Sequence, residues 1–223
     1  HTSHQGTAAT MRRARSAVFL PHMADDIRQQ TENCVTSAID APAQPNESLH
    51  NHDIPSEPWS KVGMDILTDK HKEYLIVVDY YSDFFECEPL SDMQSRTVIK
   101  ACKKIFARYG VPHQVQSVNG SQFTSAEFER FGKEWGFRNT SSSPGHQQSN
   151  GKAEAAVKII KRLMRRAEDP YLALLEFRNT PTAGMSSSPA ERMFGHGTRS
   201  ILPTGGSANK SNRVHQEKVR RKV

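Results

Sequence analysis

Long apolar runs, a cysteine framework and a secretory leader pattern are all missing from this sequence of 223 residues. No stretch approaches the roughly 18 consecutive apolar residues that a membrane-spanning helix needs. The three cysteines, Cys34, Cys87 and Cys102, are too few and too scattered to form a disulfide framework. The opening residues show no positively charged region followed by an apolar one. We therefore expect an intracellular protein, and the opening on His1 instead of Met suggests a fragment.

Apolar residues are scarce as well, at 35% of the chain, which is low for a compact domain. The length suits one ordinary domain with a small accessory module. Residues 38–60 are rich in Pro, Asn, Ser and His, a composition typical of a linker. We predict a helical module over 1–40, a linker over 41–57, a core domain over 58–203 and a disordered tail over 204–223.

The sequence also lacks an excess of acidic residues, because it has 30 Lys and Arg residues and 24 Asp and Glu residues, for a net charge of +6. Residues 205–223 hold six of the basic residues and one of the acidic ones, so the tail carries most of the net charge. Such a tail is either a solvated end or an arm that binds phosphates. Net charge alone therefore does not indicate that the folded part binds nucleic acid.

What the sequence does contain is a succession of strand and helix patterns. Strands are predicted over residues 61–68, 73–81, 84–90, 111–118 and 137–143. Helices are predicted over residues 7–33, with a break at Pro21, and over 95–110, 124–136, 152–169, 171–180 and 188–195. Thr124 and Glu127 have the spacing of a capping box. Four residues are predicted to face inward from helix 152–169: Ala153, Val157, Ile160 and Met164. This order predicts an α/β fold, a mixed five-stranded sheet flanked by helices.

Two carboxylates stand where a polar site is expected. Asp65 interrupts an apolar strand, where an unpaired buried acid is costly. Glu154 lies in the first turn of a helix, where an acid also simply favours the helix dipole. Each acid alone has a structural explanation. Together they suggest a site for Mg²⁺, which takes carboxylate oxygens and bridges to phosphates, although two-ion catalysis of phosphodiester chemistry would need further carboxylates.

Lys158, Lys161 and Arg165 follow Glu154 on the same helix face. The spacing alone leaves two interpretations open. One is an ordinary solvated basic face. The other is a stripe that leads from the carboxylates along a DNA backbone.

At this point the sequence resembles the integrases of LTR retroelements of the Ty3/gypsy type, over residues 1–203. The strings that carry the resemblance are PWSKVGMDILT, YLIVVDYYSDF, IFARYGVPHQVQSVNGSQFTSAEFERFGKEWGF, TSSSPGHQQSNGKAEAAVKIIKRL and DPYLALLEFRNTP…SSSPAERMFG. The resemblance implies an RNase H-like core with a D,D-35-E triad that binds Mg²⁺ or Mn²⁺. It also implies that the protein processes DNA ends and joins them to target DNA.

The resemblance assigns Asp65 as the first acid of the triad and Glu154 as the last. The middle position is Val118, with 35 residues between it and Glu154, so the spacing is kept and the carboxylate is missing. Valine cannot coordinate a cation, so we expect two-metal binding to fail and at most one weakly bound ion to remain. On sequence position alone, Asp79 is the strongest candidate for a substitute ligand, although the family pattern makes it structural.

The N-terminal segment resembles the zinc-binding H-H-C-C module of the same family. His1, His4 and Cys34 match three ligands, whereas Ser37 stands where the fourth, a cysteine, is expected. A structural zinc site needs four nitrogen or sulfur ligands, so the resemblance implies a damaged zinc site.

We therefore expect an integrase-like protein of DNA integration, derived from a retrotransposon, whose catalysis is lost or strongly impaired. The alternatives are a non-catalytic DNA-binding module recruited from an integrase, or a non-functional relic. The expected partners are DNA and further copies of the chain, and the expected location is the nucleus. The residues predicted to bind DNA are Gln148, Asn150, Lys152, Lys158, Lys161 and Arg165.

Overall fold

A computed structural model describes the chain over residues 5–18, 20–34, 55–141 and 151–202. The chain divides into two compact units, one formed by residues 52–161 and the other by residues 1–51 together with 162–223. The boundary falls inside helix α7 (Gly151–Arg166). Within the described ranges, no helix combines the length and the apolar character that crossing a membrane requires.

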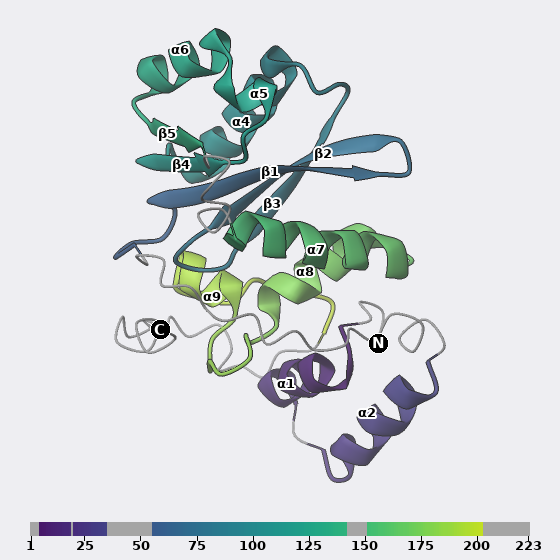
Figure 1. Ribbon diagram of the computed structural model, residues 1–223. Coiled ribbons are helices and arrows are strands. Elements are labelled where there is room, and N and C mark those ends of the chain that lie inside the picture. The colour runs from purple at the N-terminus through teal and green to yellow at the C-terminus, as the bar shows by residue number, and fades with distance from the viewer. Residues whose placement is uncertain (1–4, 19, 35–54, 142–150, 203–223) are drawn as a thin grey trace. The chain divides into compact units, whose positions relative to one another are not determined.

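The 52–161 unit is built on a five-stranded sheet with the order β3-β2-β1-β4-β5 (Figure 1). Its strands are β1 (Lys61–Asp69), β2 (Lys72–Asp79), β3 (Phe85–Leu90), β4 (Gln114–Ser117) and β5 (Arg138–Ser141). The first three strands pair antiparallel as a meander, and β4 and β5 extend the sheet in parallel from β1. The predicted mixed sheet and its strand positions are confirmed.

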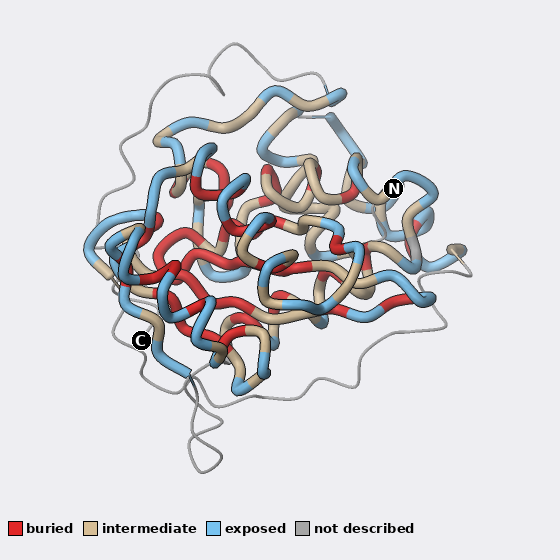
Figure 2. The backbone as a smooth tube through the Cα atoms, turned by 90° about the horizontal axis from the view of Figure 1, so that it is seen from above, coloured by how far each residue is buried: buried red, intermediate tan, exposed pale blue. Residues whose placement is uncertain are grey.

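Three helices cover one face of this sheet: α4 (Ser95–Tyr109), α5 (Ser121–Thr124) and α6 (Ala126–Trp135) (Figure 1). Their apolar stripes meet in an aromatic cluster in which Phe131 lies 5.0 Å from Phe137 and 6.0 Å from Phe106, measured between ring centroids. Offset and edge-on aromatic contacts of this kind add to the stability from burial. The buried stretches of the chain accordingly run along the strands and beneath these helices (Figure 2).

The capping box predicted at Thr124 and Glu127 is wrong. Thr124 is the last residue of α5, a short helix that the sequence did not predict, and its hydroxyl donates to the Gly120 carbonyl. Ser125 caps α6 instead, because its side chain accepts the Phe128 N–H. The true N-cap is a neighbouring serine, so the helix start shifts by one residue while the buried aromatic face stays as predicted.

Helix α7 packs its first turn against β1 at Gly63. A Cβ atom at Gly63 would lie 3.1 Å from the Ala153 Cβ and 3.2 Å from the Tyr80 ring, closer than ordinary contacts allow. The predicted inward face is only partly right. Ala153 and Ile160 are buried, whereas Val157 and Met164 are half-buried; the other fully buried residues of this helix are Ala156 and Leu163.

The second unit contains four helices in its described part: α1 (Thr7–Ala17), α2 (Met23–Glu32), α8 (Pro170–Asn179) and α9 (Pro189–Phe194). The predicted cap of α8 is confirmed, because the Asp169 carboxylate accepts two backbone N–H groups and Pro170 occupies the first turn. Arg13 of α1 forms a nearly buried ion pair with Glu176 of α8, with 2.8 Å between Nε and Oε2. Arg12 donates to the Pro181 carbonyl beside it. Side-chain hydrogen bonds thus join α1 to a segment more than 160 residues away in the sequence.

We predict that Gly63→Ala lowers the free energy of unfolding by about 1–3 kcal/mol, because the added methyl overpacks the contact between β1 and α7. Chemical denaturation of the full chain measures this effect. The matched test is the double variant Gly63→Ala/Ala153→Gly, which removes the opposing methyl. Its loss of stability should be smaller than the sum of the two single losses. Strict additivity would contradict the close contact.

Candidate functional site

Asp65 lies in the middle of β1, on the sheet face that α7 covers. It follows Gly63 by two residues, and alternate residues of a strand share a face, so its side chain is on the side where Ala153 meets Gly63. One carboxylate oxygen accepts the Ile66 N–H at 2.7 Å. The carboxylate is half-buried. An acid therefore stands on the covered face of an otherwise apolar strand.

Glu154 comes from the first turn of α7 and is exposed. Its charge acts on Asp65, whose pKa is raised above its ordinary value first by burial and further by repulsion from Glu154. The same charge acts on the buried phenol of Tyr80, whose pKa is raised by burial and by the charge of Glu154. Asp65 and Glu154 thus lie within electrostatic reach of each other.

Val118 follows directly after β4 and lies beside Asp65. The parallel register aligns Ser117 with Met64, the residue before Asp65. The Val118 N–H then donates to the Met64 carbonyl, with 3.4 Å between nitrogen and oxygen. Val118 and Asp65 therefore lie on neighbouring strand ends, and the charge of Glu154 acts on Asp65.

Asp79 is not placed to replace the missing acid. It is fully buried at the end of β2, where burial raises its pKa. Its two oxygens accept the backbone N–H groups of Trp59, Tyr81 and Ser82 and the Ser82 hydroxyl. These bonds use the carboxylate to build the turn after β2. Across the described ranges, no group of three or more His, Cys, Asp or Glu side chains is arranged to hold a metal ion.

The four residues of α7 that were predicted to bind DNA divide into two sets. Lys158 and Arg165 are exposed and Lys161 is half-buried, which keeps the predicted DNA-binding stripe accessible along the helix. Lys152 instead directs its ammonium group to the Tyr80 carbonyl and the Asp83 carboxylate. Gln148 and Asn150 lie outside the described residues.

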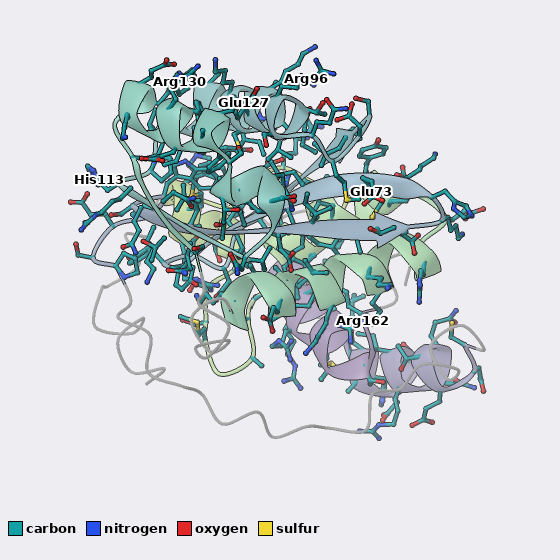
Figure 3. All side chains as sticks on the ribbon, turned by 45° about the horizontal axis from the view of Figure 1, so that its top comes forward. Glu73, Arg96, His113, Glu127, Arg130 and Arg162 are labelled. Atoms are coloured by element: carbon teal, nitrogen blue, oxygen red, sulfur yellow. The ribbon has the colours of Figure 1, made fainter. Side chains whose placement is uncertain are left out.

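The opposite face of the sheet carries charge of both signs. Arg96 on α4 and Glu127 and Arg130 on α6 are exposed and point away from the sheet (Figure 3). Lys104 and Arg108 of α4 pair with Glu88 of β3 at 2.7 and 3.2 Å. Glu88 on this face is thus paired with basic side chains, whereas Asp65 and Glu154 repel each other on the α7 face, so these two acids are the stronger candidate site.

Sequence reasoning missed the surroundings of Tyr80. The Lys61 ammonium lies 4.6 Å from the centre of the Tyr80 ring, and the Lys152 ammonium lies 5.7 Å from it. The sequence offers a weak signal for the pairing, because Asp83 is the acid that ends the turn after β2 and Lys152 opens the helix that carries Glu154. Nothing in their spacing of 69 residues indicates a contact.

The predicted zinc ligands remain a prediction. His1, His4 and Ser37 lie outside the described residues. Cys34 is half-buried just after α2, where its backbone N–H donates to the Thr31 carbonyl.

We predict that Asp65→Asn leaves the protein at least as stable at neutral pH as the natural chain. Because the folded-state pKa of Asp65 is raised, the folded protein keeps a proton at pH values where the unfolded chain has lost it. Stability therefore falls as the pH rises above the ordinary aspartate pKa of about 3.9. Asparagine removes this part of the pH dependence. Unfolding midpoints measured across the acidic to neutral range test it.

Asp79→Asn is the matched control for this prediction. The amide nitrogen would face the N–H and hydroxyl of Ser82, which now donate to a carboxylate oxygen, so the variant should lose about 1–3 kcal/mol. A loss of the same size in Asp65→Asn would show that Asp65 is also structural, contrary to the prediction.

Part of the 52–161 unit is similar in sequence to a known protein family. Residues 55–147 match the family model described as the integrase core domain. An uncharacterized protein of Caenorhabditis elegans is 27% identical over 212 residues, which cover 91% of this chain and 17% of that protein. The Pro-Pol polyprotein of feline foamy virus is 28% identical over 172 residues, which cover 73% of this chain and 14% of the polyprotein. The chain thus spans less than a fifth of the length of these relatives.

Solved structures show the same fold. The catalytic core domain of BIV integrase matches with a TM-score of 0.51 and 23% identity, covering 59% of this chain and 91% of that one. A chain of a simian T-cell lymphotropic virus intasome, in complex with a PP2A regulatory subunit, matches with a TM-score of 0.58 and 18% identity, covering 91% of this chain and 74% of that one. The five-stranded sheet and its helices therefore have the RNase H-like fold of integrase catalytic cores, and residues 55–147 are similar to the integrase core domain.

Proposed function

We propose that this chain is a retroelement integrase of the Ty3/gypsy type that binds DNA and has lost most or all of its strand-joining activity. The observation that carries the proposal is the position of Val118 beside Asp65, the acid on which the charge of Glu154 acts. A carboxylate at that position would complete a set of three acids. Valine leaves two.

The remaining acids suit one divalent cation but not two. Asp65 and Glu154 offer oxygen ligands from two different elements, and the repulsion between them is the kind that a bound cation relieves. A pair of ions needs a bridging carboxylate, and none of the described residues supplies a third acid to this group. A single Mg²⁺ or Mn²⁺, when bound, would polarise a phosphodiester. We infer that it binds weakly, and we assign no catalytic step to it.

DNA binding rests on different residues from catalysis. Lys158, Lys161 and Arg165 extend from Glu154 along the accessible side of α7, at spacings that allow successive contacts with a phosphate backbone. Gln148 and Asn150 lie outside the described residues and are proposed as DNA contacts on the resemblance alone. By likeness to the intasome chain, we infer that the protein acts as a multimer on DNA in the nucleus.

A non-catalytic DNA-binding module is the second candidate function. It is favoured by the same observation, because the accessible basic stripe is kept while the middle carboxylate is lost. A relic without any activity is the remaining alternative. It predicts no measurable DNA binding by the purified chain.

We predict that Val118→Asp restores Mn²⁺-dependent strand joining, raising it by several orders of magnitude over the natural chain, because the third carboxylate completes the two-metal ligand set. The assay uses the full chain and a duplex that ends in the element's own terminal sequence. Val118→Asn is the matched control, since it has the same shape as aspartate and no charge. Joining by the natural chain that Glu154→Gln abolishes would contradict the proposal, because another group would then supply the ligand.

We predict that Lys158→Glu/Lys161→Glu weakens DNA binding, whereas Glu154→Gln does not. Each lost phosphate contact should reduce the slope of the logarithm of the binding constant against the logarithm of the salt concentration by about 0.9. Titrations at several salt concentrations measure the slope. An unchanged slope in the double variant would place the DNA elsewhere.

A further inference from the structure

The contacts of Lys152 attach the start of α7 to the turn between β2 and β3. Its ammonium nitrogen donates to the Tyr80 carbonyl at 2.5 Å and to the Asp83 carboxylate at 2.7 Å. Both side chains of the ion pair are about one-quarter to one-third exposed. Two of the three N–H donors of the ammonium group are therefore already used by one turn of the same unit.

The turn is built to present these two acceptors. Asp79 anchors it by accepting the Tyr81 and Ser82 N–H groups. Asp83 has a φ of 60°, in the left-handed region that aspartate tolerates better than most residues, and its N–H donates to the Asp79 carbonyl. This backbone path sends the Asp83 carboxylate and the Tyr80 carbonyl towards the same point, where the ammonium group lies.

The Tyr80 ring completes the attachment. It is 1% exposed, and it lies against the site where Ala153 meets Gly63. The ammonium groups of Lys61 and Lys152 lie 4.6 and 5.7 Å from its centre, within the range of cation–π attraction. The first turn of α7 is thus held by a polar contact through Lys152 and by an apolar one through Ala153, the two residues that come just before Glu154.

We propose that Lys152 is a positioning residue, which holds the first turn of α7 on the β2–β3 turn and so sets where Glu154 lies relative to Asp65. This goes beyond the DNA-contacting role that its sequence position suggests. A phosphate would have to compete with Asp83 for a group that is already hydrogen-bonded. The inference depends on the proposed function only in treating Asp65 and Glu154 as the site.

A positioning role and a purely stabilising role of Lys152 predict different effects on metal affinity and on the unfolding midpoint. A partly exposed ion pair contributes little to stability, so loss of Lys152 should leave the protein folded. Residues that orient metal ligands have a larger effect on the ligands' affinity, about 10–100-fold. If Lys152 orients Glu154, its removal will therefore change metal binding more than it changes the unfolding midpoint.

The experiment compares four substitutions in the full chain: Lys152→Met, Lys152→Arg, Asp83→Asn and Lys61→Met. The first removes both hydrogen bonds to the turn, and the third removes the charge of Asp83 while the amide oxygen and the Tyr80 carbonyl can still accept. Arginine keeps a cation that can donate to both acceptors. Lys61→Met is the matched control, because it removes the other cation on the Tyr80 ring and leaves the hydrogen bonds of Lys152 intact. Three measurements are made: amide hydrogen exchange of the first turn of α7, Mn²⁺ affinity by electron paramagnetic resonance in the Val118→Asp background, and the salt dependence of DNA binding.

We predict faster exchange in the first turn of α7 and about tenfold weaker Mn²⁺ binding for Lys152→Met, and smaller changes in the same direction for Asp83→Asn. Lys152→Arg should recover most of the affinity, and Lys61→Met should change neither quantity. The salt dependence of DNA binding should stay unchanged in all four.

Two results would overturn the proposal. One is a salt-dependence slope reduced by about 0.9 in Lys152→Met with exchange unchanged, which would make Lys152 a DNA contact. The other is unchanged exchange together with unchanged Mn²⁺ affinity. Absence of Mn²⁺ binding by the Val118→Asp chain itself would instead refute the proposed metal site, and the exchange measurement would still decide the role of Lys152.

Discussion

The close approach of α7 to β1 at Gly63 is the contact on which the candidate site depends. Only a residue without a side chain allows Ala153 to reach the strand, and Asp65 and Glu154 stand two residues and one residue away from this contact. The helix therefore delivers a carboxylate to a strand that already carries one. The ionised form of Asp65 is disfavoured there, because burial and the charge of Glu154 both raise its pKa.

Val118 changes the balance of charge at this point as well as the chemistry. An aspartate beside Asp65 would add a third negative charge to two that already repel each other, and a cation would then be needed to offset them. With valine, the site holds two acids, one of them exposed to solvent. The chain can therefore fold around this site without a bound metal ion, and valine at position 118 avoids the repulsion that a third carboxylate would add.

The sequence predicted the parts of the fold that follow from periodicity and composition. The strands of the meander, the aromatic face of α6 and the Asp169 cap depend on residues adjacent in sequence, and all were correct. The errors arise where neighbouring residues compete for one role, as Thr124 and Ser125 do at the start of α6. Asp65 and Glu154 were singled out by an acid within a strand pattern and an acid in a first helical turn, and the role of position 118 came from the resemblance. The contact of Lys152 with the turn after β2 was missed, because only the folded backbone brings those segments together.

The ion pair between Arg13 and Glu176 has a consequence for how the chain folds as it is synthesised. One unit is assembled from both ends of the sequence, while residues 52–161 lie between them. At about 5–20 residues per second, α1 leaves the ribosome many seconds before α8 exists. The inner unit can complete its sheet during that interval. Arg13 must therefore remain without the Glu176 carboxylate, its partner in the folded unit, until that segment has been synthesised.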